Sequence, residues 1–124
     1  MPDIWLPVTQ QNLEIAAGSP LDFSTFLSNP AITEERRLII NPDGRIALQS
    51  NPSVPYRLLC GTIGTIPDNA TADKMAVQLR RHGYNSVRFH FLDIALMDGQ
   101  LQDFGYRQDT LDRFRYFMAV LKQN

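Results

Sequence analysis

The clearest alternation of apolar and polar residues in the first half of the chain lies between residues 37 and 48. Two short runs rich in β-forming residues, 38–40 and 45–48, flank the sequence Asn41-Pro42-Asp43-Gly44. Proline presets φ at the first central position of a turn, and glycine accepts a positive φ where the chain reverses. The pattern predicts a β-hairpin over about residues 37–48. Residues 51–55 (NPSVP) are expected to be a connector, because their prolines exclude a helix interior and a central strand.

The second half begins with the pattern of a buried strand followed by an amphipathic helix. Residues 56–64 (YRLLCGTIG) form a short apolar run that ends in glycine. In residues 71–83, apolar side chains recur at helical spacing, at Ala72, Met75, Ala76 and Leu79. Thr71 is the expected N-cap of this helix, and Gly83 is the expected glycine after its last turn.

A second strand is predicted over residues 84–93 (YNSVRFHFLD). Successive side chains of a strand point to opposite faces, so one face is expected to be apolar and to carry Val87, Phe89 and Phe91. Arg88 and His90 occupy the other face, and Asp93 lies at the end of the strand. A polar, glycine-containing loop of about a dozen residues is expected next.

The last pattern is that of an amphipathic helix over residues 109–124, capped by Asp109 or Thr110. Its apolar stripe is predicted to consist of Leu111, Phe114, Met118 and Leu121. The resulting order of strand, helix, strand and helix predicts an α/β fold with parallel strands joined by a right-handed crossover.

The first 35 residues lack a regular pattern, except for one helical turn between two prolines with Ser19 or Asp22 as its cap. One alternative is that this segment wraps the open sheet and that the chain folds independently. The apolar residues that would allow it are Trp5, Leu13, Ile15, Phe23 and Phe26. Two parallel strands alone leave two open edges and are marginally stable. We expect low stability and self-association through these edges instead.

Composition narrows the classes of function. The net charge is -1 and the cations are dispersed, so neither a nucleic-acid nor a membrane partner is expected. Cys60, the only cysteine, lies in an apolar run and is expected to be a small buried hydrophobe, and no metal or cofactor site is predicted. The N-terminus lacks the pattern of a signal peptide, and no apolar run reaches the ~20 residues of a membrane span. The sequence as written is expected to be cytoplasmic, with export of a parent enzyme left open.

An ordered set of residues in the second half resembles a known family. The set consists of Leu79, Gly83, Asn85, Val87, Arg88, His90 and Asp93, followed by Leu111, Asp112, Leu121 and Lys122. It resembles the second-strand region of clan A (β/α)8-barrel glycoside hydrolases, and among these the cellulase-like, family 5-type enzymes. The resemblance covers roughly residues 13–124. It implies a partial TIM barrel, in which residues 56–124 supply the first two βα units and residues 1–55 form an N-terminal extension with the hairpin.

The resemblance also implies a function. Enzymes of this family are retaining glycosidases that use two glutamates, one after the fourth strand and one after the seventh. The glutamates of this chain, Glu14, Glu34 and Glu35, all precede the first predicted barrel strand, so no catalytic residue is assigned and the chain is expected to be inactive alone. By the resemblance, Arg88 braces the nucleophile carboxylate, His90 borders the sugar subsite, and Asp93 binds sugar hydroxyls or orders the next loop.

Other interpretations of the same residues stay open. A lone histidine on a strand is typical of a core or rim residue, and an arginine can pack its stem while its charged head reaches solvent. The chain would then be a small non-enzymatic α/β module that binds a partner or a sugar and completes its sheet by oligomerisation. The predicted partner of the glycosidase fragment is a carbohydrate substrate.

Overall fold

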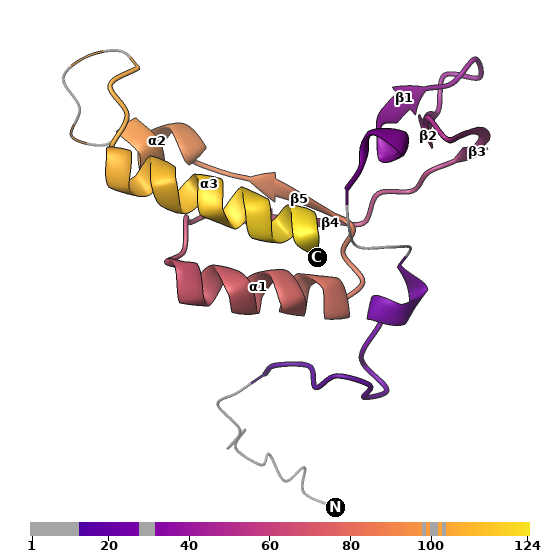
Figure 1. The fold of residues 1–124 in the computed structure, drawn as a ribbon, viewed down its shortest axis with the longest axis horizontal. Coiled ribbons are helices and arrows are strands. Elements are labelled where there is room, and N and C mark those ends of the chain that lie inside the picture. The colour runs from indigo at the N-terminus through magenta and orange to yellow at the C-terminus, as the bar shows by residue number, and fades with distance from the viewer. Residues whose placement is uncertain (1–12, 28–31, 98, 100–101, 103) are drawn as a thin grey trace, which may run out of the picture.

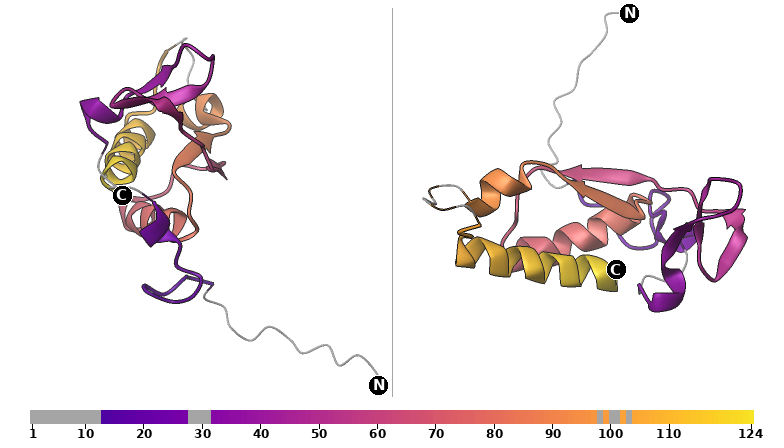
Figure 2. Two further views of the ribbon diagram at one scale, coloured as in Figure 1. Left: turned by 90° about the vertical axis from the view of Figure 1, so that its right-hand side faces the viewer. Right: turned by 90° about the horizontal axis from the view of Figure 1, so that it is seen from above.

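The fold is mixed α/β, and its centre is a pair of parallel strands covered by two helices. The computed structural model describes residues 13–27, 32–97, 99, 102 and 104–124. Strand β4 (Cys60–Ile63) pairs in parallel with β5 (Ser86–Phe89), in a register that runs from Cys60 opposite Ser86 to Ile63 opposite Phe89. Helices α1 (Asn69–Arg81) and α3 (Gln108–Gln123) lie together on one side of this pair (Figure 2). The predicted order of strand, helix, parallel strand and helix is confirmed.

The hydrophobic core lies between the two strands and the two helices. It is built on Ile63, Ala72 and Phe117, and its partly buried members are Met75, Leu79, Val87, Phe89 and Leu121. Phe117 is the largest fully buried side chain, and its ring meets that of Phe89 edge-on at 5.8 Å. Core packing therefore fixes the β5 face that carries Val87 and Phe89 toward the helices.

The predicted stripe of α3 is confirmed in part, because Leu121 packs against the core and the ring of Phe114 meets that of Phe89 edge-on at 5.2 Å. Met118, predicted to be in the stripe, is 46% exposed, whereas the neighbouring Phe117 is completely buried. Thr110 and Val120 are the other buried residues of this helix. Apolar side chains occupy adjacent positions in this helix, so two overlapping sets of residues both have helical spacing. Spacing alone does not predict which set is buried.

Helix α1 begins earlier than the sequence predicts. The N-cap is Asp68, whose Oδ1 accepts a hydrogen bond from the backbone amide of Thr71 at 2.8 Å, and Thr71 itself lies in the first turn. The prediction of Thr71 as the cap is therefore wrong. Hydrogen bonds from Thr71 also lower the pKa of the Asp68 carboxyl, since they favour its charged form.

The end of α1 confirms the predicted glycine. Gly83 has a φ of 84°, the amide of Tyr84 donates to the carbonyl of Leu79, and the amide of Gly83 donates to that of Arg80. This pair of hydrogen bonds is a Schellman motif, which satisfies carbonyls that the helix leaves open. Helix α3, in contrast, starts after Arg107 without a side-chain cap, so the caps predicted at Asp109 or Thr110 are wrong.

The hairpin belongs to a separate three-stranded antiparallel sheet. Strands β1 (Leu38–Ile40) and β2 (Ile46–Leu48) form the predicted hairpin, and Gly44 has the positive φ that the turn requires, 74°. The segment predicted as a connector is an edge strand instead, β3 (Asn51–Pro55), which pairs with β2. An edge strand needs hydrogen bonds on one side only, so it tolerates prolines that a central strand would not.

Asn41 ties the turn of the hairpin to the third strand. This residue is only 5% exposed. Its Oδ1 accepts hydrogen bonds from the amides of Asp43 and Arg45, at 3.1 and 2.8 Å, and its Nδ2 donates to the Pro52 carbonyl at 3.1 Å. The buried amide therefore has its polar atoms satisfied, which avoids the cost of an unpaired buried group.

The N-terminal segment is attached to α1 mainly by polar contacts. The amide of Ile15 donates to Oε1 of Gln78 at 2.8 Å, and Arg81 donates to the Ile15 carbonyl at 2.7 Å. The predicted helical turn is the 3₁₀ helix η1 (Ser24–Phe26), whereas a second such turn, η2 (Glu34–Arg36), was not predicted. Leu13 and Phe26 are 80% and 81% exposed, so they do not act as apolar anchors, and Trp5 lies outside the described residues.

A short helix replaces the end of the predicted strand and the beginning of the predicted polar loop. Helix α2 (Leu92–Met97) follows β5 almost at once, and Figure 1 shows it and the three-stranded sheet at opposite ends of the parallel pair. Within the ranges given above, no helix combines the length and the apolar character that a membrane span requires.

Candidate functional site

The face of the parallel strands turned away from the helices is polar. Burial alternates along β4, where Gly61 and Ile63 are buried and Cys60 and Thr62 are exposed. On β5 the register places Ser86 beside Cys60 and Arg88 beside Thr62. Cys60 is thus exposed, which corrects the prediction of a buried thiol. The outward face therefore carries small polar side chains and a guanidinium group.

Arg88 and His90 lie toward the carboxyl end of this face. Arg88 is exposed, and its side chain makes no hydrogen bond or ion pair with another described residue. The His90 amide donates to the Ile63 carbonyl at 2.8 Å, which extends the ladder of the two strands by one bond. The predicted alternation of Val87 and Phe89 with Arg88 is confirmed by the packing of the two apolar residues on the core.

Phe91 departs from the predicted pattern. It was expected on the helix-facing side, but it is 65% exposed and has a φ of 56°. The strand ends at Phe89, and the Phe91 carbonyl accepts the hydrogen bond of the Ala95 amide at 2.9 Å as the chain enters α2. A bulky residue in the left-handed region costs of the order of 1–3 kcal/mol, and such residues are concentrated at functional sites.

The ring of Phe91 is also placed against the imidazole of His90. The two ring centroids are 5.9 Å apart, with an angle of 66° between the planes. An exposed aromatic side chain held next to an imidazole forms an apolar surface beside a hydrogen-bonding group. Alternation by itself predicts a buried Phe91, so it could not reveal this arrangement. The only signal in the sequence was the short distance between the strand and Asp93.

Asp93 lies in the first turn of α2, so it is not the terminal residue of the strand as predicted. It is exposed, and no contact joins it to Arg88 or His90 among the residues described. The structure thus brings Arg88, His90 and Phe91 to one end of β5 and places Asp93 on the element that follows. Together these side chains offer a cation, an imidazole, a carboxylate and an aromatic ring at the end of one strand.

Among the described residues, no glutamate lies at this end of β5. Glu34 and Glu35 lie in η2, which precedes β1 and lies beyond the amino-terminal end of β4 and β5. Glu14 belongs to the N-terminal segment. Over the described parts of the chain, no group of three His, Cys, Asp or Glu side chains is placed to hold a metal ion. The arrangement can bind a polar ligand, but it holds no pair of glutamates to cleave one.

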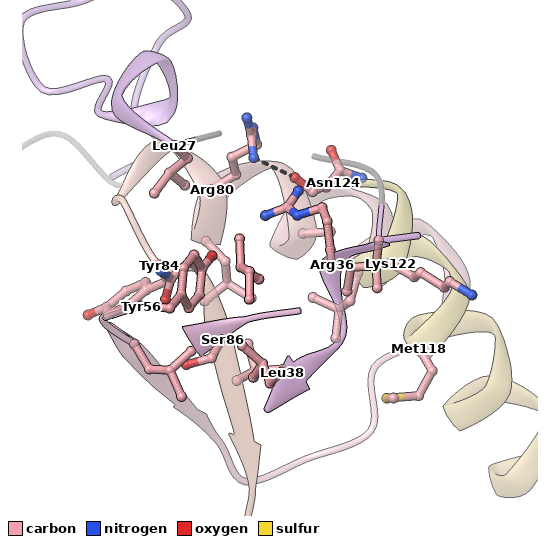
Figure 3. A pocket seen from close by; sticks show the side chains of 18 of the residues that line it. Leu27, Arg36, Leu38, Tyr56, Arg80, Tyr84, Ser86, Met118, Lys122 and Asn124 are labelled. Carbon is pink, nitrogen blue, oxygen red and sulfur yellow. Dashed lines mark hydrogen bonds between the residues drawn. The ribbon is translucent and has the colours of Figure 1, made fainter. Parts of the chain in front are cut away.

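A cavity that the sequence did not predict lies at the opposite end of the strands. It has a volume of about 690 Å³, and Ser86 and Val87, where β5 begins, are in its wall (Figure 3). The other walls come from the hairpin, α1 and α3, which are far apart in the sequence. No local pattern could reveal this cavity, because it forms only when these elements come together.

Asn85, one of the residues that carry the family resemblance, has a structural role at the cavity end, where the strands begin. Its Oδ1 accepts from the Leu59 amide and its Nδ2 donates to the Arg57 carbonyl, both at 2.8 Å. The side chain thereby joins the segments that lead into β4 and β5.

No protein-family model matches the sequence, and the searches of curated proteins and of solved structures gave no match either. The functional interpretation therefore depends on the residues and their geometry.

Proposed function

We propose that residues 56–124 are the first two βα units of a retaining (β/α)8-barrel glycoside hydrolase, and that Arg88, His90 and Asp93 line its sugar site. The observation that carries this proposal is the distribution of side chains on the parallel strands. Helices cover one face, and the other face is polar and carries a cation and an imidazole at the carboxyl end. In (β/α)8 enzymes the strands are covered by helices on their outer side and the active site lies at the carboxyl ends.

The chemistry of each group suits that role. A guanidinium fork orients a carboxylate by paired hydrogen bonds and keeps it ionised, which is what a nucleophile carboxylate requires. His90 and Asp93 offer donors and acceptors for sugar hydroxyls, and the exposed ring of Phe91 offers an apolar face for the sugar ring. Retaining cleavage needs two carboxyl groups about 5–5.5 Å apart. Both would come from later βα units, so the chain by itself would not hydrolyse glycosides.

The sugar site can be tested on the chain itself by NMR titration with cellotetraose. We expect weak binding, with Kd of the order of 1 mM, because only one part of the site is present. Backbone resonances of Arg88, His90, Phe91 and Asp93 should shift, and those of the three-stranded sheet should not. Arg88→Ala should weaken binding severalfold. Arg45→Ala, which changes an exposed arginine of the hairpin, is the matched control.

Two results would count against the sugar site. One is the absence of shifts near Arg88 at concentrations of tens of millimolar. The other is an equal effect of Arg88→Ala and Arg45→Ala, since binding would then not depend on the outward face of β5.

A second candidate function is that of a binding module that completes its sheet with another chain. The observation that favours it is that β4 and β5 pair only with each other in the described part of the chain, so each has an outer edge. Such edges pair readily with strands of other molecules. Sedimentation velocity over a hundredfold range of concentration should show a shift toward dimers or larger species. A monomer over the whole range would exclude this candidate.

A further inference from the structure

The cavity at the start of the parallel strands has the size and the lining of a ligand site. Its volume of about 690 Å³ lies within the range of about 300–1,000 Å³ that is typical of small-molecule sites. Most of its lining is apolar and includes Leu38, Leu48, Leu58, Leu79 and Leu121. Leu38 and Leu58 are still 46% and 42% exposed, so the cavity leaves apolar surface open to solvent.

The charged side chains of the lining all have the same sign. Four cationic side chains contribute to it, Arg36, Arg37, Arg80 and Lys122, and no aspartate or glutamate does. Arg80 and Lys122 belong to the last turns of α1 and α3, whose carbonyl ends each carry a partial charge of about half a unit. Asn124 also lies in the lining, and its terminal carboxylate, which accepts from Arg80, adds one full negative charge. Four full positive charges still exceed this charge and the two partial ones, so the lining favours an anion.

The cations are not spread evenly around the cavity. Figure 3 shows the guanidinium groups of Arg36 and Arg80 on the side nearest Asn124, and the rings of Tyr56 and Tyr84 on another side. Arg80 is held there by its hydrogen bonds to the carbonyl oxygens of Asn124, at 2.8 Å, and Ser24, at 3.5 Å. A ligand that fits this arrangement has an anionic head at one end and an apolar body.

We propose that this cavity binds an amphipathic anion, namely a long-chain carboxylate whose head lies beside Arg36 and Arg80 and whose apolar tail covers the leucines. The guanidinium fork matches the geometry of a carboxylate, and burial of the tail removes apolar surface from water. The site is independent of the proposed sugar site, because it lies at the opposite end of β5 from Arg88 and His90.

The probes for this site are laurate and dodecanol, which have the same tail and differ in the charge of the head. Isothermal titration calorimetry below the micellar concentration should show that laurate binds at one site per chain. Dodecanol should bind at least about tenfold more weakly, because it lacks the charged hydrogen bonds. NMR shifts caused by laurate should be centred on Tyr56, Leu79 and Tyr84.

Two variants locate the site. Ala119→Phe places a large side chain in the wall of the cavity on a residue that is exposed, so the fold should tolerate it, and we expect laurate binding to fall at least about tenfold. Its matched control is Ala70→Phe, an exposed position of α1 outside the cavity. Arg36→Gln should weaken laurate binding about tenfold and leave dodecanol binding unchanged, with Arg45→Gln as its control.

The proposal would be overturned by any of three results: no binding of laurate to the unaltered chain, equal binding of laurate and dodecanol, or unchanged laurate binding in Ala119→Phe. The comparison of the two probes needs no variant, so it decides the question even if a substitution disturbs folding.

Discussion

Phe91 and Asp22 each have a local property that their residue type does not prefer, and Phe104 shares the left-handed backbone of Phe91. Phe91 holds a left-handed backbone while its ring stays exposed, and Asp22 holds a carboxylate with a strongly lowered pKa. Neither property follows from the residue type or from the alternation around it. Each results from the way in which the chain turns at that position, which sequence patterns describe poorly.

At Phe91 we predict opposite effects on stability and on binding. Phe91→Gly should raise the midpoint of thermal unfolding, because glycine populates positive φ without steric cost. The same change should weaken cellotetraose binding, since it removes the exposed ring. Phe26→Gly is the control, because Phe26 is 81% exposed but lies in a 3₁₀ turn that gains nothing from glycine. Equal loss of stability in both variants would contradict the strain assigned to Phe91.

At Asp22 we predict a pH-dependent contribution to stability. Hydrogen bonds from Ser24 and from the Gly18 amide lower the pKa of the Asp22 carboxyl from 3.8 to about 2. Between these two values the unfolded chain binds more protons than the folded one, so the contribution is complete above pH 3.8 and is lost as the pH falls toward about 2. The free energies of unfolding of the unaltered chain and of Asp22→Asn, measured with urea, should differ at pH 5 and converge near pH 2. A difference that is constant across this range would contradict the assignment.

At the scale of elements, the sequence predicted the long periodic segments well and their boundaries poorly. Helix α1, strand β5 and the hairpin were identified because apolar spacing and turn residues agree there. The cap at Asp68 was missed because both Asp68 and Thr71 are good caps, and the choice depends on where the preceding loop ends. Strand β3 was missed because its prolines are compatible with an edge, which only the complete sheet reveals.

Phe117 provides the test of the core that these elements form. Phe117→Ala should lower the free energy of unfolding by about 3–5 kcal/mol, because the side chain is fully buried and leaves a cavity. Phe104→Ala, at a residue that is 79% exposed, should change it by less than about 0.5 kcal/mol. Urea titration followed by circular dichroism measures both. Similar values for the two variants would show that α3 does not pack as described.

At the scale of the whole molecule, two parallel strands carry a polar site at one end and an apolar cavity at the other. The sequence alone indicated the first, because Arg88 and His90 alternate with apolar residues on one strand. It could not indicate the second, whose walls come from distant segments. In the described part of the chain β4 and β5 pair only with each other, which connects this geometry to the central proposal, since a barrel would pair both outer edges with further strands.

The most direct measurement of the central proposal is the activity of a chimera. The chimera joins residues 1–124 to βα units three to eight of a cellulase-like, family 5-type glycosidase, which supply both glutamates. We predict hydrolysis of p-nitrophenyl β-cellobioside by the chimera, none by the chain alone, and a loss of about 100-fold or more in kcat in the Arg88→Ala chimera, because Arg88 would orient the nucleophile carboxylate. The Arg45→Ala chimera should keep full activity. A folded chimera without activity, or one whose kcat is unchanged by Arg88→Ala, would contradict the proposal.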